Sequence, residues 1–122
     1  MNTKLAEKEI YISEIVSRLK KISPYRIILF GSHALGTAQK GSDIDIIVVT
    51  NDEYMPENYK QKSDLYLRIS NLLGEFLRKT PIDIIVYTKP MYNRFNELGS
   101  VFSKEIGQKG VILYEADKQG MA

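Results

Sequence analysis

Apolar residues recur at helical intervals in three segments of the chain. In the first segment, from Leu5 to Ile22, they lie three, four or seven positions apart with charged residues mostly between them, and Ser23-Pro24 ends the pattern. The second segment covers 65–77 with Gly74 inside it, and the third covers 91–106 with a break near Gly99. Apolar residues at this spacing form one face of an amphipathic helix, so the pattern predicts helical structure in all three segments.

Four short apolar runs have the composition of strands. They cover 25–30, 44–49, 82–87 and 111–115, and the first is almost wholly apolar, which is typical of a strand covered on both faces. Strands interleaved with helices predict an α+β domain, close to α/β, in which a mixed β-sheet has its helices packed on one face. We expect one domain over residues 1–122, with 115–122 as a flexible tail.

The linker between the first two apolar runs has the composition of an anion-binding loop. It contains Gly31, Gly36 and Gly41 together with small hydroxyl residues, and Ser32 follows the first glycine directly. Glycine lets backbone N–H groups approach an anion closely, and the start of a helical turn favours negative charge. The linker therefore predicts a phosphate-binding loop between two strands.

Acidic residues interrupt two of the predicted strands. Asp43 and Asp45 stand two positions apart, so on a strand they point to the same side, about 7 Å apart along the chain. Two carboxylates placed in this way can hold a hard cation such as Mg²⁺, which commonly binds substrate phosphates as well. Asp83 lies within the apolar run 82–87, where a buried carboxylate needs solvent, a hydrogen-bonding partner or a cation. Alternatively, Asp83 caps the preceding turn and points outward.

Composition and charge narrow the classes of function. The chain is 43% apolar and 26% charged, as in an ordinary soluble protein, and a net charge of +2 is too small to argue for a nucleic-acid partner. It contains no cysteine, which excludes disulfides, thiolate metal sites and cysteine nucleophiles. No apolar run approaches the roughly 18 residues of a membrane span, and the first residues lead into a charged segment rather than a signal peptide. We therefore expect a cytoplasmic protein.

The stretch 30–49 resembles the signature of the minimal nucleotidyltransferases, small members of the DNA polymerase β superfamily. The resemblance rests on two elements ahead of an apolar strand: Gly31-Ser32 with a further Gly36, and the run Ser42-Asp43-Ile44-Asp45. It implies a palm-like nucleotidyltransferase sheet and a reaction that transfers a nucleoside monophosphate to an acceptor hydroxyl.

The resemblance also implies roles for particular residues. Four would contact the phosphates of ATP or another nucleoside triphosphate: Gly31, Ser32, His33 and Ser42. Three would be catalytic and would together bind two Mg²⁺ ions: Asp43, Asp45 and, on a later strand, Asp83.

Two positions depart from the family's pattern. His33 and Leu35 stand where relatives often have arginine, which grips phosphate with two donors, whereas histidine offers one and titrates near neutral pH. His33 is therefore either a phosphate contact or an ordinary surface histidine. Arg26 and Lys40 are the candidates to replace the missing charge.

Three functions remain open at this stage. In the first, the chain is a Mg²⁺-dependent transferase that moves AMP from ATP to a partner protein, as the resemblance to antitoxins of HEPN-fold toxins implies. In the second, it is an antitoxin that acts by binding its partner alone. In the third, it modifies a small molecule such as an aminoglycoside, although 122 residues leave little room for an acceptor pocket unless a homo-oligomer completes it. All three acids are present, which favours the first function.

Overall fold

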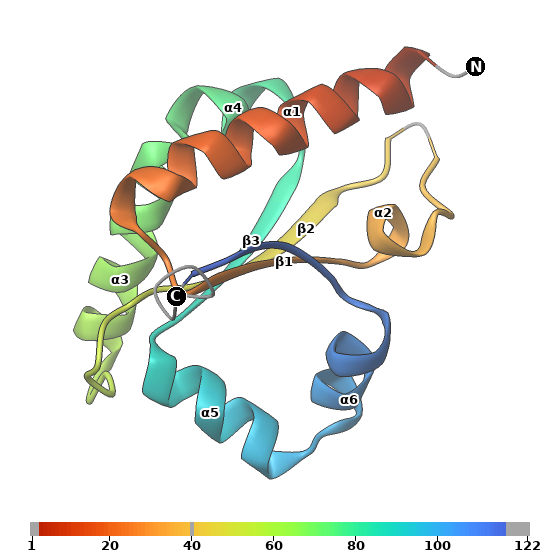
Figure 1. The fold of residues 1–122 in the computed structure, drawn as a ribbon. Coiled ribbons are helices and arrows are strands. Elements are labelled where there is room, and N and C mark those ends of the chain that lie inside the picture. Colours follow the sequence, from red (N-terminus) through yellow and green to blue (C-terminus); the bar gives the residue numbers. More distant parts are fainter. Residues whose placement is uncertain (1–2, 40, 117–122) are drawn as a thin grey trace.

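Four strands of the described chain form one mixed sheet. The computed structural model describes residues 3–39 and 41–116, with side chains from residue 8 onward. The strands are β1 (Arg26–Phe30), β2 (Ile44–Val49), β3 (Ile82–Tyr87) and β4 (Val111–Glu115), in the order β3-β2-β1-β4. β1 is antiparallel to both β2 and β4, whereas β2 and β3 are parallel (Figure 1). The predicted α+β class and mixed sheet are confirmed.

One face of the sheet is covered by the helices that precede β1 and β3. These are α1 (Thr3–Leu19) with a 3₁₀ turn, η1 (Lys20–Ile22), then α3 (Tyr59–Leu72) and α4 (Gly74–Lys79). Their apolar sides pack on alternate residues of the strands in a core that includes Ile15, Leu19, Ile46, Ile69 and Leu73, all fully buried. Burial of these branched side chains, each worth about 1.5–3 kcal/mol, fixes α1 and α3 on the sheet.

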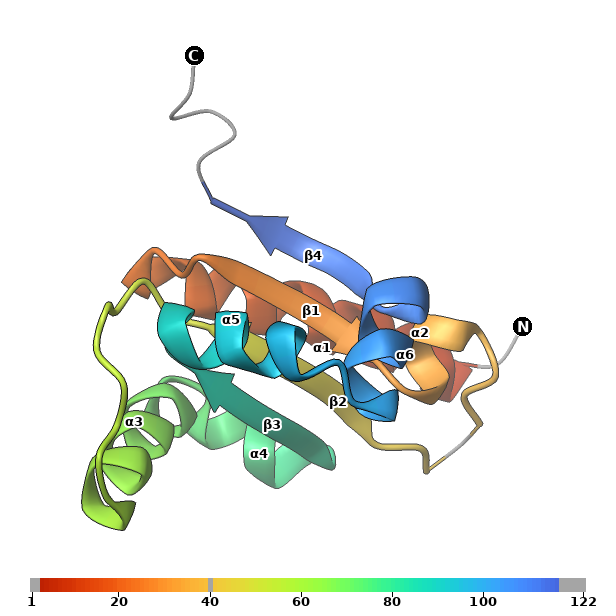
Figure 2. The same cartoon turned by 90° about the horizontal axis from the view of Figure 1, so that it is seen from below.

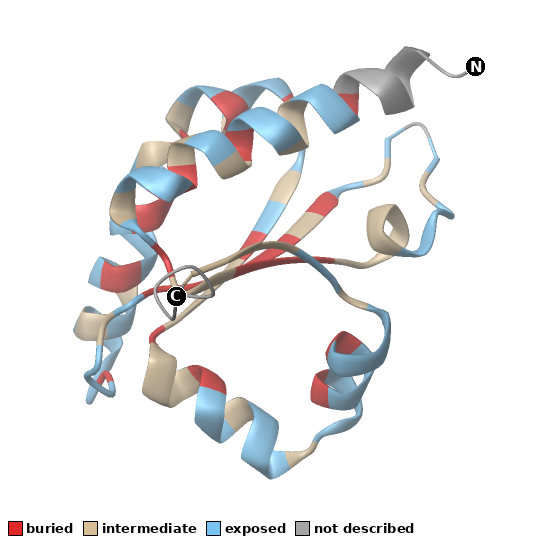
Figure 3. Cartoon of the chain, in the orientation of Figure 1, coloured by how far each residue is buried: buried red, intermediate tan, exposed pale blue. Residues whose placement is uncertain are grey.

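The opposite face is also covered by helices, so the prediction that helices pack on one face was wrong. α5 (Lys89–Leu98) and α6 (Val101–Lys109) lie on this face, in front of the sheet in Figure 2. The cause is visible in β1 and β2, because Ile28, Ile47 and Val49 project to this side and must also be removed from water. Tyr92 of α5 and Ile106 of α6 cover them, and Figure 3 shows the resulting concentration of buried residues in the sheet.

The helices end close to where the pattern predicted. The second predicted helix is divided at Leu73 into α3 and α4, and the third is divided at Gly99, which adopts a left-handed conformation with φ 59°. Side chains cap three of the helices by accepting a backbone N–H: Asn58 for α3, Thr88 for α5 and Ser100 for α6. Such caps satisfy N–H groups that would otherwise lack a partner at the start of a helix.

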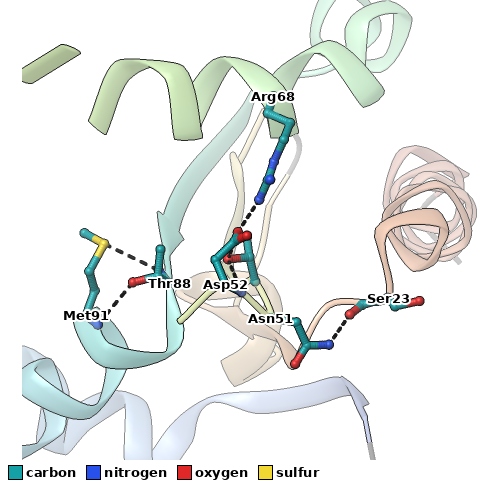
Figure 4. Close-up of polar contacts among 7 residues, drawn as sticks. Ser23, Asn51, Asp52, Arg68, Thr88 and Met91 are labelled. Atoms are coloured by element: carbon teal, nitrogen blue, oxygen red, sulfur yellow. Dashed lines mark hydrogen bonds and ion pairs between the residues drawn. The ribbon is translucent and has the colours of Figure 1, made fainter. Parts of the chain in front are cut away.

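One end of the sheet is closed by polar contacts, drawn in Figure 4. After β2, the Thr50 hydroxyl donates to Asp52 Oδ2 over 2.7 Å, and Arg68 of α3 donates to the same oxygen. Asn51 donates to the Ser23 carbonyl, which ties this end to the start of β1. The predicted phosphate loop lies at the opposite end of β1 and β2.

Two expectations concern the ends of the chain and the membrane. Glu115 belongs to β4 and Ala116 donates its N–H to the Tyr25 carbonyl over 2.9 Å, so the predicted tail does not begin at 115. The rest of that tail, 117–122, lies outside the described residues. No helix in the described part of the chain is long and apolar enough to cross a membrane.

Candidate active site

The turn after β1 places its backbone directly against the carboxylate of Asp45. Phe30 pairs with Asp45 across β1 and β2, and Gly31 follows with φ 74° and ψ −156°. Only glycine adopts this conformation readily, and a Cβ on Gly31 would lie 2.2 Å from Asp45 Oδ2. Glycine is therefore required here both by backbone conformation and by the space that the carboxylate occupies.

A short helix begins at this turn. α2 (Ser32–Leu35) has Gly31 as its N-cap residue, and the N–H groups of Ala34 and Leu35 both donate to the Gly31 carbonyl over 3.1 Å. The first N–H groups of a helix have no acceptor within it, so those at Ser32 and His33 are available to a ligand. The Gly31-Ser32 turn, predicted to bind phosphate, thus lies next to Asp45.

Asp45 and Asp83 are neighbours across the parallel strands β2 and β3. They are directly in register, which places their Cα atoms about 5 Å apart. The residues on either side of each aspartate, Ile44 and Ile46 in β2 and Ile82 and Ile84 in β3, pack in the α1 core. Because side chains alternate along a strand, both carboxylates project to the opposite face of the sheet. Asp83 is exposed there, so its apolar strand leaves it in contact with solvent.

The carboxylate of Asp45 lies in an acidic environment. Burial raises the pKa of Asp45 above its ordinary value, and the neighbouring carboxylates of Asp83 and Asp43 raise it further, while His33 opposes them. Asp43 is exposed and stands just before β2. A half-buried carboxylate with two acidic neighbours is destabilised in its ionised form, and a cation at this place would relieve the repulsion.

The loop between α2 and β2 is held by residues from other elements. The Ser42 carbonyl oxygen accepts a hydrogen bond from Lys8 Nζ of α1, and His33 Nε2 lies 3.5 Å from the same oxygen. Ser42 also closes its own turn, because its hydroxyl accepts from the Gln39 N–H over 2.8 Å. His33 therefore faces the acidic loop rather than bulk solvent. The periodicity of the first helix placed Lys8 on its polar side, and its contact 34 residues away has no signal in the sequence.

The three predicted metal ligands do not form a ready-made metal cage. In the described part of the chain, no group of three or more His, Cys, Asp or Glu side chains is gathered closely enough to hold a metal ion by itself. Asp45 and Asp83 lie side by side, and Asp43 lies within electrostatic range of Asp45. Their role as metal ligands stays a prediction.

Arg26 does not supply the charge that arginine provides in the family's motif. It pairs with Val49, at the end of β1 remote from Asp45, and donates to the Tyr92 hydroxyl and to Glu115. These contacts link β1 to α5 and β4, so its role is structural. The other candidate, Lys40, lies outside the described residues.

Replacing Gly31 tests the close approach of the turn to Asp45. Gly31→Ala should lower the free energy of unfolding by roughly 3 kcal/mol or more, because backbone strain of about 1–3 kcal/mol adds to a steric clash of similar cost. Gly36→Ala is the matched control, since Gly36 also has a positive φ of 76° but nothing within 4 Å of an added Cβ. It should lose only about 1–2 kcal/mol. Equal losses in urea unfolding would contradict the proposed contact.

Because the pKa of Asp45 is raised in the folded chain, replacing this aspartate by a neutral residue should stabilise the fold, and the gain should depend on pH. The folded chain holds this proton more tightly than the unfolded chain, so the cost of ionised Asp45 is absent below its unfolded pKa of about 4. The cost grows as the pH rises toward the folded pKa and is complete above it. Without divalent cations, Asp45→Asn should therefore be more stable than the wild type at pH 7, and the difference should disappear on acidification.

The control for this measurement is Asp64→Asn, because Asp64 is an exposed residue of α3. Asp64 pairs with Lys60 on the surface over 2.9 Å, so its loss should cost little at any pH. An Asp45→Asn protein that is less stable than the wild type at pH 7 would contradict the electrostatic description.

Comparisons with known proteins identify the family and the fold. A family model described as a nucleotidyltransferase domain matches residues 10–75, a range that contains the Gly31 turn and both Asp43 and Asp45 but ends before Asp83. Among curated proteins, none matches the chain.

Several solved structures share the fold. A proposed nucleotidyltransferase from Sulfolobus solfataricus is 18% identical with a TM-score of 0.61, over 97% of this chain and 93% of that one. A toxin-antitoxin complex with AMP-PNP is 22% identical with a TM-score of 0.55, over 88% and 75% of the two chains. A MntA-HpeT toxin-antitoxin variant, with two aspartates replaced by glutamate, is 20% identical with a TM-score of 0.53 over the same shares.

Identities this low establish a common fold and no more. The family model is stronger, because it spans more than half of the 122 residues and includes the turn and the aspartate pair of the candidate site. The chain belongs to the family of nucleotidyltransferase domains.

Proposed function

We propose that this domain transfers AMP from MgATP to a hydroxyl group of a partner protein, as the antitoxin of a toxin-antitoxin pair. The observation that supports it best is the register of Asp45 with Asp83 beside the Gly31 turn. This arrangement sets two carboxylates next to backbone N–H groups that have no acceptor in their helix. Carboxylates favour a cation and free N–H groups favour an anion, so together they fit a metal-bound phosphate chain.

The donor set suits Mg²⁺ in particular. Mg²⁺ prefers oxygen ligands and commonly takes only one or two carboxylates, completing its shell with water and substrate phosphates. An open arrangement, with Asp45 and Asp83 adjacent and Asp43 at the rim, therefore fits a metal that arrives with its nucleotide. When bound, the metal would neutralise charge on the phosphates and lower the pKa of the acceptor hydroxyl.

The protein's own residues would orient the reactants. The N–H groups of Ser32 and His33 would hold the phosphate chain, and His33 faces the same loop as the acids. In the reaction, the acceptor oxygen bonds to the α-phosphorus and the bond to the bridging oxygen breaks, which releases pyrophosphate. The hydroxyl proton passes to water or to one of the three carboxylates. Catalysis in such a site comes mainly from positioning and charge stabilisation.

The similar structures support the choice of ATP as the proposed donor and of a toxin as the proposed partner. One of them is a toxin-antitoxin complex with AMP-PNP, an ATP analogue, and another carries substitutions in two aspartates that stand two positions apart. Asp43 and Asp45 have the same spacing. By this analogy we propose ATP as the donor and a toxin, with the HEPN fold implied by the sequence resemblance, as the acceptor.

A second candidate function is neutralisation of the partner by docking alone. It is favoured by a groove of about 310 Å³ between the 51–58 loop and α5. Most of its lining is apolar: Met55, Pro56, Tyr87, Met91, Phe95 and Leu98. Leu98 is 66% exposed, and Lys62 and Arg94 also line the groove, so it fits an apolar segment of a partner that carries acidic residues.

Transfer of a radioactive label separates the two functions. The domain, the protein encoded beside it, Mg²⁺ and α-labelled ATP should place label on the neighbouring protein. Asp43→Ala combined with Asp45→Ala should abolish the label while the thermal unfolding transition persists, because the phosphates lose their cation. The control is Asp64→Ala, which leaves the site intact.

Two outcomes would contradict the catalytic function. Undiminished label in the double variant would exclude these aspartates from catalysis. Absence of label with the wild type, while the neighbouring protein is still bound and inactivated, would favour the docking function.

A further inference from the structure

Lys8 links α1 to the loop that carries Asp43, on the side of Asp43 that precedes β2. On the other side of Asp43, the Ile44 N–H donates to the Pro81 carbonyl over 3.0 Å. Within the described part of the loop, the backbone hydrogen bonds are local: Thr37 N–H to the Ser32 carbonyl over 3.0 Å and Ser42 N–H to the Gln39 carbonyl over 2.9 Å. The hydrogen bond from Lys8 Nζ to the Ser42 carbonyl comes instead from α1, 34 residues earlier in the chain. Figures 1 and 2 both show the N-terminal half of α1 extending toward this end of the sheet.

Lys8 is buried in a way that general packing does not explain. The residue as a whole is only 8% exposed, and among the described residues it forms no ion pair. Burial of an ammonium group is costly unless it is paired or well hydrogen-bonded, and an apolar side chain of similar size would be tolerated at least as well. A lysine at this place therefore indicates a role beyond filling space.

The position of its acceptor suggests that role. The Ser42 carbonyl and the Asp43 N–H belong to one planar peptide unit, so a hydrogen bond to the carbonyl also fixes the plane from which the Asp43 side chain begins. His33 Nε2 lies 3.5 Å from the same carbonyl, so α1 and α2 both reach this one atom. The far end of α1 is anchored in the core by Ile15 and Leu19, both fully buried.

We propose that Lys8 is a positioning residue that holds Asp43 beside Asp45 and the Gly31 turn, and so prepares the site for the metal-bound nucleotide. This inference rests on the proposed function. Lys8 acts through Ser42 and is not itself a ligand of the metal or the phosphates. Without it, the Ser42–Asp43 peptide is held by the weak His33 contact and by the loop's own hydrogen bonds, whereas the next peptide stays fixed by the Ile44 N–H bond to the Pro81 carbonyl over 3.0 Å.

Two measurements on the 122-residue chain test this role. The first is hydrogen exchange at the amides of Ser42 and Asp43, with no ligand present. The second is the Mg²⁺ concentration that gives half-maximal binding of AMP-PNP. Loss of a residue that orients metal ligands typically weakens metal binding about 10–100-fold. Lys8→Met should speed the exchange of these amides and raise the half-maximal Mg²⁺ concentration by about tenfold or more.

Two variants serve as controls. Lys21→Met removes the same charge from an exposed position in η1 and should match the wild type in both measurements. Lys8→Arg keeps a charged donor and should restore most of the protection and most of the metal affinity. Should Lys8→Met not fold, Lys8→Gln, whose shorter side chain cannot reach the carbonyl as well, takes its place with the same expected shifts.

The outcomes distinguish this proposal from the function on which it rests. Identical behaviour of Lys8→Met and Lys21→Met would overturn it, and so would faster exchange with an unchanged Mg²⁺ requirement, which would make Lys8 a purely structural anchor. If the wild type and Lys21→Met fail to bind AMP-PNP at any Mg²⁺ concentration, the proposed function itself fails. The exchange measurement then still shows whether Lys8 holds the loop.

Discussion

Two carboxylates lie side by side on one face of the sheet because β2 and β3 are parallel and in register at Asp45 and Asp83. Partial burial raises the pKa of Asp45, and repulsion from Asp83 and then from Asp43 raises it further. A stable fold gains nothing from acids placed in this way, since a neutral pair would avoid the cost. His33 opposes this shift, and a bound cation would relieve the repulsion further.

The rest of the architecture is consistent with an open site at this end of the sheet. Helices cover both faces, and polar contacts around Thr50 and Asp52 close the opposite end. At the open end, Gly31 allows the backbone to approach Asp45 without a clash and starts α2 there. The Gly31 turn, α2, Asp43 and Asp45 thus come from consecutive parts of one β-turn-helix-loop-β unit, and β3 adds Asp83.

Local patterns in the sequence predicted much of this arrangement. The runs at 44–49, 82–87 and 111–115 match β2, β3 and β4, because apolar β-branched runs bounded by turn residues have few other stable conformations. The sequence also predicted that the glycine-rich turn lies beside the Asp43-x-Asp45 pair, because these residues are close together in the chain, and the structure places Gly31 against Asp45. That Asp83 lies next to Asp45 depends on strand order, which the pattern alone does not determine, and the family resemblance supplied it.

The features that the sequence did not predict are those set by tertiary packing. The prediction that helices pack on one face overlooked Ile28, Ile47 and Val49, which require cover on the second face. Arg26 was a candidate for the missing phosphate-binding charge. It lies at the remote end of β1, however, where its guanidinium donates hydrogen bonds to Tyr92 and Glu115. Lys8 has no local signal, because its acceptor is 34 residues away and depends on how α1 crosses the sheet.

The central claim is that Asp43, Asp45 and Asp83 receive a metal-bound triphosphate beside the Gly31 turn. Its most direct test is a crystal structure with AMP-PNP and Mn²⁺, in which anomalous scattering locates the metal. The account predicts an anomalous peak within bonding distance of the Asp45 carboxylate and at least one other of these aspartates, with the phosphates against the N–H groups of Ser32 and His33. A nucleotide bound elsewhere, or Mn²⁺ bound away from all three aspartates, would contradict it.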